Sequence, residues 1–411
     1  MPTEEVSAAA YILIAQPRGQ PSRPCLTHVL VSGALLSAVC LITLMLAGTL
    51  PARSSMLELA VPSTNESAPQ PQVLACAFVH GAGNSAESDP STIGSITEEN
   101  VYYWGQVHQV LRPFCFSFHF MHEDTLHAGW DEPRLQRRLC SLLHAAASAT
   151  SFSEGRGGRV AIFAHSLGNL LVAGALHSGQ CALPPAAAWF AVAAPWAGSK
   201  AADKLPELCA GVMGGFASQM IQSLASRQHF CDGPDGGPSA GYASLKTTNA
   251  QLLEAARQWQ WRVNASLCGD SAFGLWASEG GGVDSYELRA LAEFVQYGEA
   301  NDGAVPTGPC HSAAGSLAAG RTPLSVHYSA SVNHYDLTCR HGDGWLPWLL
   351  PRDARRPCAW YAAMAERMVS AGQPPSHADG HSLPEGATAR AAPSSSRATW
   401  STVAPRQEIT N

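Results

Sequence analysis

The sequence predicts an α/β fold with a mostly parallel central sheet. Residues 73–79 and 160–164 are continuous apolar runs, typical of strands that are buried on both faces. Each run ends in a turn that contains glycine. About 85 residues separate the two turns, which leaves room for two intervening units of strand and helix. Such alternation of strands and helices is typical of parallel sheets.

Further elements follow the same rhythm. Phenylalanine alternates with other residues through 114–120, which predicts a strand with one strongly apolar face. Residues 134–147 predict a helix, whereas 187–194 and 324–328 predict strands. We expect one large domain over residues 73–370 with an inserted cap.

The first of the chemical motifs is a sharp turn at Ser166, between an apolar strand and an apolar helix that begins at Leu167. Strand and helix cross so closely at such a turn that small residues are needed two positions before and after the serine. Ala164 and Gly168 meet this need, and His165 lies directly before the serine. The pattern predicts a nucleophile elbow, although alanine at 164 replaces the commoner glycine. A structural serine in an ordinary turn is the alternative.

A glycine-rich loop, His80-Gly81-Ala82-Gly83, follows the apolar run 73–79. Backbone N–H groups face a substrate in loops of this kind. We expect the N–H groups of Ala82 and Leu167 to form an oxyanion hole, which stabilises the negative charge on a carbonyl oxygen under attack. A plain turn after a strand is the alternative.

A candidate acid and a candidate base follow the serine in the chain order Ser166, Asp302, His334. Asp302 lies in an Asn-Asp-Gly turn, and His334 lies in a loop after a predicted strand. A histidine can take the proton from an attacking serine, while an aspartate orients the imidazole and stabilises its cation. The local competitors are His311, His327 and His341 for the base and Asp270 for the acid.

These motifs together resemble those of lipases in the α/β-hydrolase superfamily, over about residues 72–370. The resemblance is closest to bacterial secreted triacylglycerol lipases, which have a similar Asn-Asp-Gly-x-Val turn at the acid and a similar Asn-His-x-Asp loop at the base. It implies that Ser166, Asp302 and His334 form a catalytic triad. It also implies that Asp336 could help to bind a structural calcium ion, and it implies no other cofactor.

Residues 196–258 interrupt the rhythm of strands and helices where hydrolases of this class commonly insert a cap. This segment could present an apolar face to an acyl chain, although ordinary packing of a helix explains the same spacing equally well. The side chains concerned are Val212, Met213, Phe216, Met220, Ile221 and Leu224.

Residues 25–50 predict a transmembrane signal anchor, because no Asp, Glu, Lys or Arg occurs between Arg23 and Arg53. Residues 26–50 are almost wholly apolar, and at about 1.5 Å per residue a helix over them reaches about 37 Å, enough to cross a bilayer core of about 30 Å. A cleaved signal peptide would have a shorter apolar run. We expect 1–24 to be a cytosolic tail and 51–72 a stalk.

Ten cysteines follow the predicted anchor, which permits up to five disulfides, and no Cys-x-x-Cys pair suggests zinc. Asn65 and Asn264 lie in glycosylation sequons. Together with the anchor these features predict a catalytic domain on the luminal or extracellular side of a membrane of the secretory pathway. Residues 371–411 have few large apolar side chains and predict a disordered tail.

Composition excludes some functions and leaves others open. The net charge is -7, charged residues make up 14% of the chain, and no basic cluster occurs, so nucleic-acid binding is not expected. The leading hypothesis is a membrane-anchored serine hydrolase that cleaves a carboxylic ester of a lipid through an acyl-enzyme. The same triad would also suit a GPI-inositol deacylase, a thioesterase or an acyltransferase. A catalytically silent hydrolase-like binding protein is the third hypothesis.

Overall fold

The computed structural model describes residues 73–85, 96–151, 159–211, 216–275, 281–311, 319–344 and 352–370. The predicted tail, anchor and stalk, the sequon at Asn65 and the predicted C-terminal tail lie outside these residues. Within the described ranges, no helix has the length and apolar character that crossing a membrane requires.

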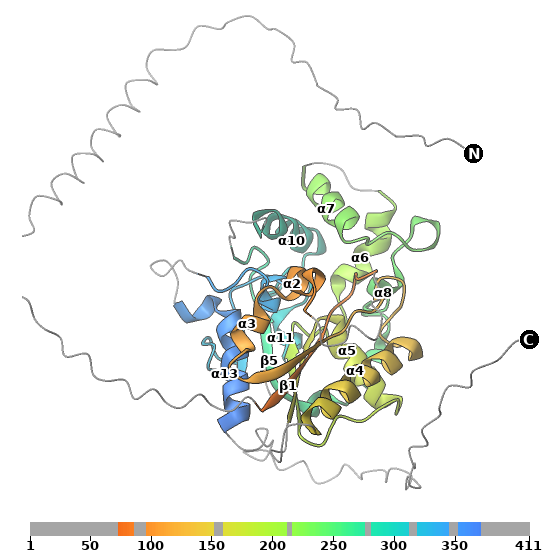
Figure 1. Ribbon diagram of the computed structural model, residues 1–411. Coiled ribbons are helices and arrows are strands. Elements are labelled where there is room, and N and C mark those ends of the chain that lie inside the picture. Colours follow the sequence, from red (N-terminus) through yellow and green to blue (C-terminus); the bar gives the residue numbers. More distant parts are fainter. Residues whose placement is uncertain are drawn as a thin grey trace, which may run out of the picture. The chain divides into compact units, whose positions relative to one another are not determined.

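A six-stranded sheet forms the centre of the domain, and all of its strand pairs are parallel (Figure 1). The predicted parallel α/β sheet is therefore confirmed. The strand order is β2-β1-β3-β4-β5-β6. The strands are β1 (Leu74–Val79), β2 (Cys115–Phe120), β3 (Arg159–His165), β4 (Ala187–Val192), β5 (Val263–Gly269) and β6 (His327–Ala330).

The central strands are apolar throughout because both faces of the sheet are covered. In β1, Ala75 and Ala77 face one hydrophobic cluster, while Cys76 and Phe78 face another. Helices α4 (Pro133–Ser151), α5 (Leu167–His177) and α9 (Ala250–Arg257) supply the first cluster. On the opposite face lie α3 (Val107–Leu111) and α13 (Pro357–Ser370), as Figure 1 shows.

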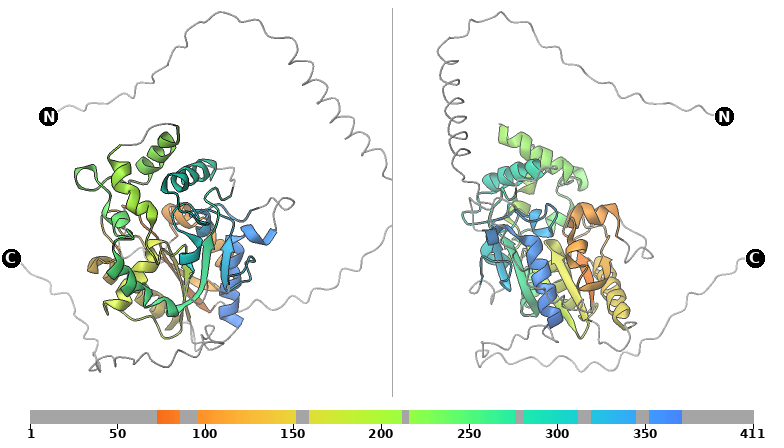
Figure 2. Two further views of the ribbon diagram at one scale, coloured as in Figure 1. Left: turned by 180° about the vertical axis from the view of Figure 1, so that it is seen from behind. Right: turned by 60° about the vertical axis from the view of Figure 1, so that its left-hand side comes forward.

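Three helices lie above one end of the sheet (Figures 1 and 2), and their buried side chains form a third hydrophobic cluster. Its helices are α6 (Lys200–Cys209), α7 (Phe216–Arg227) and α10 (Gly281–Val295), which we call the upper layer. The remaining described elements are short: α2 (Glu98–Trp104), α8 (Ala240–Ala243), α11 (Thr307–Cys310) and the 3-10 turns Pro234–Gly236, Gln260–Arg262, Asp336–Thr338 and Arg352–Arg355.

The upper layer differs from the predicted cap segment, 196–258, in two ways. Helix α9 lies within that segment but packs on α5 beside the sheet, where Leu253 and Ala256 are buried. Helix α10 lies outside it, after β5, yet packs on α6 and α7. An apolar helical face finds its partner through tertiary packing, which sequence position alone does not specify.

The predicted capacity for five disulfides is confirmed, because all ten cysteines after the predicted anchor are paired. The pairs are Cys76–Cys115, Cys140–Cys181, Cys209–Cys231, Cys268–Cys310 and Cys339–Cys358. The first joins the neighbouring strands β1 and β2, and the third closes the chain between α6 and the residues after α7. A disulfide of this kind stabilises a fold by about 2–4 kcal/mol, mainly by constraining the unfolded chain.

The second predicted glycosylation site has an unexpected position. Asn264 lies in β5 rather than in a surface loop, and its Oδ1 atom accepts a hydrogen bond of 2.8 Å from the backbone N–H of Trp189. Ser266, the third residue of the sequon, is fully buried. An N-linked glycan needs an exposed acceptor, so the prediction of glycosylation at Asn264 is not supported.

Candidate active site

Ser166 occupies the turn between strand β3 and helix α5, as the elbow pattern predicts. Its backbone has φ 52° and ψ -128°, a conformation that non-glycine residues rarely adopt. The backbone N–H of Ser166 donates a 2.9 Å hydrogen bond to the carbonyl of Val192 at the end of β4. The elbow is thus held by the neighbouring strand, and it presents the hydroxyl beyond the end of the sheet.

The small residues around the serine are explained by crowding. A Cβ atom at Gly168 would lie 2.7 Å from the carbonyl oxygens of both Val79 and His80, so a larger residue would force the helix away from β1. Ala164 is fully buried in the cluster beneath the elbow, where its methyl group fits. Alanine in place of glycine at this position therefore leaves the elbow intact.

Asn169 braces the elbow from below, a role that the sequence motif does not reveal. Its buried Nδ2 atom lies 2.9 Å from the carbonyl oxygen of Ala164, 3.3 Å from that of Ser166 and 3.0 Å from that of Val192. Its Oδ1 atom accepts a hydrogen bond from the indole N–H of Trp189. One amide thereby ties three carbonyl groups around the serine to the core.

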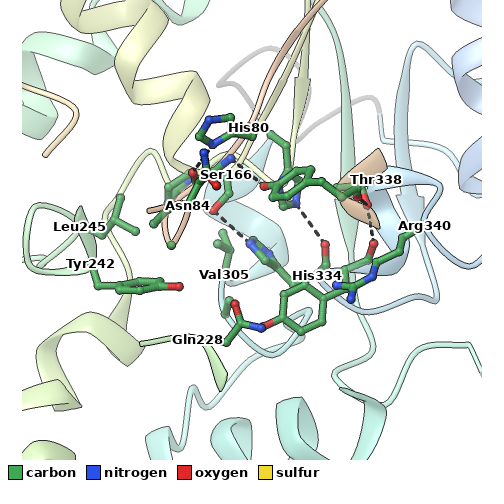
Figure 3. Close-up of a pocket in the computed structure, with 18 of the residues that line it drawn as sticks. His80, Asn84, Ser166, Gln228, Tyr242, Leu245, Val305, His334, Thr338 and Arg340 are labelled. Atoms are coloured by element: carbon green, nitrogen blue, oxygen red, sulfur yellow. Dashed lines mark hydrogen bonds between the residues drawn. The ribbon is translucent and has the colours of Figure 1, made fainter. Parts of the chain in front are cut away.

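The structure brings Ser166, His334 and Asp302 into one hydrogen-bonded line. Figure 3 shows the bond between Ser166 and His334. His334 Nε2 lies 3.0 Å from Ser166 Oγ, and His334 Nδ1 lies 2.8 Å from Asp302 Oδ2. The other carboxylate oxygen of Asp302 accepts the backbone N–H groups of Ala304 at 2.9 Å and Val305 at 2.7 Å. With both oxygens engaged and the side chain buried, Asp302 is fixed in one orientation.

The competing acid and bases are engaged elsewhere. His311 and His327 both hydrogen-bond the hydroxyl of Ser266, through Nδ1 atoms at 2.7 Å and 2.9 Å. Asp270 forms an ion pair with Arg321.

The backbone N–H groups of the glycine-rich loop differ in their partners. Gly81 donates to the hydroxyl of Tyr103 at 2.6 Å, and Gly83 donates to the carbonyl of Thr125 at 3.4 Å. The N–H groups of Ala82, between them, and of Leu167, after the serine, donate to no protein group in the part of the chain that the structure describes. These are the two groups predicted for the oxyanion hole, and both are available to a ligand.

A second chain of hydrogen bonds runs through His165, which the sequence marks only as the neighbour of the serine. Tyr103 Oη lies 2.6 Å from His165 Nδ1, and His165 Nε2 lies 3.1 Å from the carbonyl oxygen of His334. Burial lowers the pKa of His165 well below its usual value, so the ring is neutral. Since a carbonyl only accepts, the proton is on Nε2, and Nδ1 accepts from the Tyr103 hydroxyl. This chain links the loop at Gly81 to the backbone of His334.

Asp336, the residue proposed for calcium from the resemblance, is not suited to a cation. One carboxylate oxygen accepts the backbone N–H groups of Leu275 at 2.7 Å and Asn333 at 3.0 Å, and the other lies 2.7 Å from Nδ1 of His341. These partners are hydrogen-bond donors, whereas calcium is held by oxygen ligands. Across the ranges described, no group of three or more His, Cys, Asp or Glu could hold a metal ion. Asp336 instead shapes the loop that carries His334.

A cavity of about 640 Å³ opens over Ser166 and His334. Its apolar wall comes from the upper layer and from the chain that follows α7, with Ala201, Leu205, Phe230, Leu288 and Leu291. Among the described residues of the predicted apolar face, Met220, Ile221 and Leu224 do not line it, and the last two are buried against α10. For these residues ordinary helix packing, the alternative, is the correct interpretation.

Comparison with known proteins finds similarity only among solved structures. No protein-family model matches the chain, and no curated protein matches it. A metagenomic carboxyl esterase is 14% identical over 73% of this chain and 76% of its own, with a TM-score of 0.39. Phospholipase PlaB from Legionella pneumophila is 16% identical over 58% of this chain and 45% of its own, with a TM-score of 0.34. A thermostable carboxyl esterase from Bacillus coagulans is 13% identical over 54% of this chain and 79% of its own, with a TM-score of 0.25.

TM-scores this low carry no functional argument, so only the geometry of this chain bears on its function. The parallel sheet, the strand–turn–helix elbow and the order of serine, acid and base are those of the α/β-hydrolase fold. The predicted resemblance is thus confirmed at the level of the fold.

Proposed function

We propose that this protein is a serine hydrolase of the esterase and lipase type, which cleaves a carboxylic ester through an acyl-enzyme. The observation that carries the proposal is the line Asp302–His334–Ser166, which ends in a cavity beside two backbone N–H groups without protein partners among the described residues. Nucleophile, base, orienting acid and oxyanion donors are the complete set that acyl transfer requires.

In the proposed reaction, Ser166 Oγ bonds to the acyl carbonyl carbon while its proton passes to His334 Nε2. The electron pair of the carbonyl moves onto its oxygen, where the N–H groups of Ala82 and Leu167 stabilise the charge. Collapse of this intermediate breaks the ester C–O bond, and the departing alkoxide takes the proton from His334 and leaves as an alcohol. Water then attacks the carbonyl carbon of the acyl-enzyme while His334 takes its proton. The bond to Ser166 Oγ breaks, the carboxylic acid leaves, and the serine hydroxyl is restored with the proton from His334. The carboxylate of Asp302 orients the imidazolium and stabilises its charge.

A lipid ester is the substrate class that the cavity favours. Its apolar wall suits an acyl chain, and its volume of about 640 Å³ is of the size that binds small organic molecules. The predicted signal anchor at 25–50 would hold the enzyme beside such a substrate, with the domain on the luminal or extracellular side. In sealed microsomes the domain is then protected from added protease until detergent opens the vesicles. Cleavage without detergent would reverse this topology.

The experiment that tests the activity compares Ser166→Ala with wild type on a short-chain p-nitrophenyl ester. Loss of the nucleophile is expected to lower turnover by several powers of ten, because only binding and the oxyanion donors remain. Ser141→Ala, on the exposed side of α4, serves as the matched control and keeps full activity. A fluorophosphonate probe should label wild type but not Ser166→Ala. Equal turnover in the two proteins, or no labelling of wild type, would favour a binding protein without catalysis.

A further inference from the structure

Tyr242 extends into the cavity from α8, a short helix in the segment after α7 (Figure 3). Its ring packs edge-on against Phe230, with centroids 4.6 Å apart and an interplanar angle of 76°. This contact fixes the ring, so the phenol oxygen points in one direction into the cavity.

The hydroxyl of Tyr242 reaches the glycine-rich loop that carries the proposed oxyanion donor Ala82. A Cβ atom at Gly83 would lie 2.1 Å from Tyr242 Oη, far inside contact distance, and Gly83 has φ +100°, a conformation that favours glycine. Glycine at this position therefore leaves the space that the phenol oxygen fills. Gly83 directly follows Ala82, whose N–H is one of the two proposed oxyanion donors.

The hydroxyl of Tyr242 has no hydrogen-bond partner among the described residues, in contrast to the hydroxyls of Tyr103 and Tyr361. Tyr103 Oη accepts from Gly81, and Tyr361 Oη donates to the carbonyl of Leu337 at 2.9 Å. Tyr242 is half-buried and lines the cavity, so its hydroxyl is open to a molecule that binds there. A hydroxyl that faces a cavity can gain its partner from the molecule that enters it.

Burial raises the pKa of Tyr242 well above its usual value, so the phenol keeps its proton at neutral pH. A protonated phenol can donate to an ester oxygen, which only accepts.

We propose that Tyr242 is a substrate-binding residue, whose hydroxyl donates a hydrogen bond to an oxygen of the bound ester beside the oxyanion loop. This inference rests on the proposed esterase function. It adds a side-chain donor from the segment after α7 to the two backbone donors, Ala82 in the glycine-rich loop and Leu167 at the start of α5. It also requires a substrate that places an oxygen acceptor against Gly83, while its acyl chain lies along the apolar wall.

The test is Tyr242→Phe in the full-length chain, assayed with p-nitrophenyl esters of short and medium chain length. Removing one preorganised donor is expected to lower kcat/KM by about 10- to 100-fold. A fall in kcat indicates a bond to the carbonyl oxygen that strengthens in the transition state, and a rise in KM indicates a bond already made to the bound ester. The melting temperature should not fall, because the hydroxyl bonds no described protein group.

Tyr328→Phe is the matched control, because Tyr328 lies in β6, away from the cavity. Its hydroxyl accepts a hydrogen bond of 3.0 Å from the backbone N–H of Arg356. This variant should lose stability and keep kcat/KM. Tyr242→Phe with kcat/KM within about twofold of wild type would overturn the inference and leave the esterase function standing. If wild type is no more active than Ser166→Ala, the proposed function fails, and the role of Tyr242 fails with it.

Discussion

Replacement of Asp302 by asparagine exchanges one carboxylate oxygen for an NH₂ group and so tests the proposed role of Asp302 as the acid of the triad. In the wild-type structure Asp302 Oδ1 accepts two backbone N–H groups, at 2.9 Å and 2.7 Å, and Oδ2 faces His334 Nδ1 at 2.8 Å. An asparagine must keep its oxygen toward the two N–H donors, since an amide NH₂ there would meet two other donors. In the Asp302→Asn variant the amide NH₂ group is therefore directed at His334 Nδ1.

This orientation forces the imidazole into the wrong tautomer. His334 Nδ1 must then accept a hydrogen bond, so the ring proton lies on Nε2, which faces Ser166 Oγ and can no longer take its proton. Loss of the tautomer and of the charge that stabilises the imidazolium is worth about 10⁴-fold in kcat, or about 5.5 kcal/mol of transition-state stabilisation. The fold should persist, because the turn keeps both of its backbone hydrogen bonds.

The assay measures kcat for a p-nitrophenyl ester with Asp302→Asn and with the matched change Asp270→Asn, whose carboxylate pairs with Arg321 outside the site. We expect the first variant to lose about four powers of ten and the second to remain near wild type. An Asp302→Asn variant that retains activity within about tenfold of wild type would refute the reasoning. A large loss in Asp270→Asn alone would show that the acid had been misassigned.

Two further predictions concern Tyr103 and two buried histidines. Tyr103→Phe removes the acceptor for Gly81 N–H and the donor to His165, so we expect it to lower the free energy of unfolding by about 2–4 kcal/mol and to lower kcat by at least about tenfold. Denaturant unfolding and ester kinetics measure these two effects, and unchanged values in both would contradict the prediction. Burial lowers the pKa of His80 and of His311 from 6.5 to about 4. The unfolded chain therefore binds more protons between pH 6.5 and 4, and stability falls in that interval as the pH is lowered, by about 3 kcal/mol for each group. Denaturant unfolding across this range should show the loss, and His311→Asn should reduce it; an equally steep loss in the variant would contradict the assignment.

The sequence by itself determined the parts of this protein that depend on local pattern. Continuous apolar runs predicted the buried strands, and the predicted helix at 134–147 lies within α4. The elbow at Ser166 could be recognised because its small neighbours, Ala164 and Gly168, must stand at fixed distances along the chain. Asp302 and His334 could be selected from many carboxylates and 16 histidines because each lies in a short motif in the expected chain order.

Only the tertiary structure decided which residues complete the site. Tyr103 and Tyr242 meet the glycine-rich loop from distant segments, and Asn169 braces the elbow through carbonyl groups of two strands. The tertiary structure also decided how the ten cysteines pair. It placed α10 in the upper layer and α9 beside the sheet, although α9 lies within the predicted cap segment.

The physical reason lies in the range of the interactions. Strand and helix patterns repeat along the chain because neighbouring side chains share a face, so they can be found in any one segment. A hydrogen bond from Tyr103 to His165, or a hydroxyl placed against Gly83, joins residues that only the folded chain brings together, and no local spacing encodes it. The sequence therefore determined the candidate nucleophile, base and acid, and the fold decided what surrounds them.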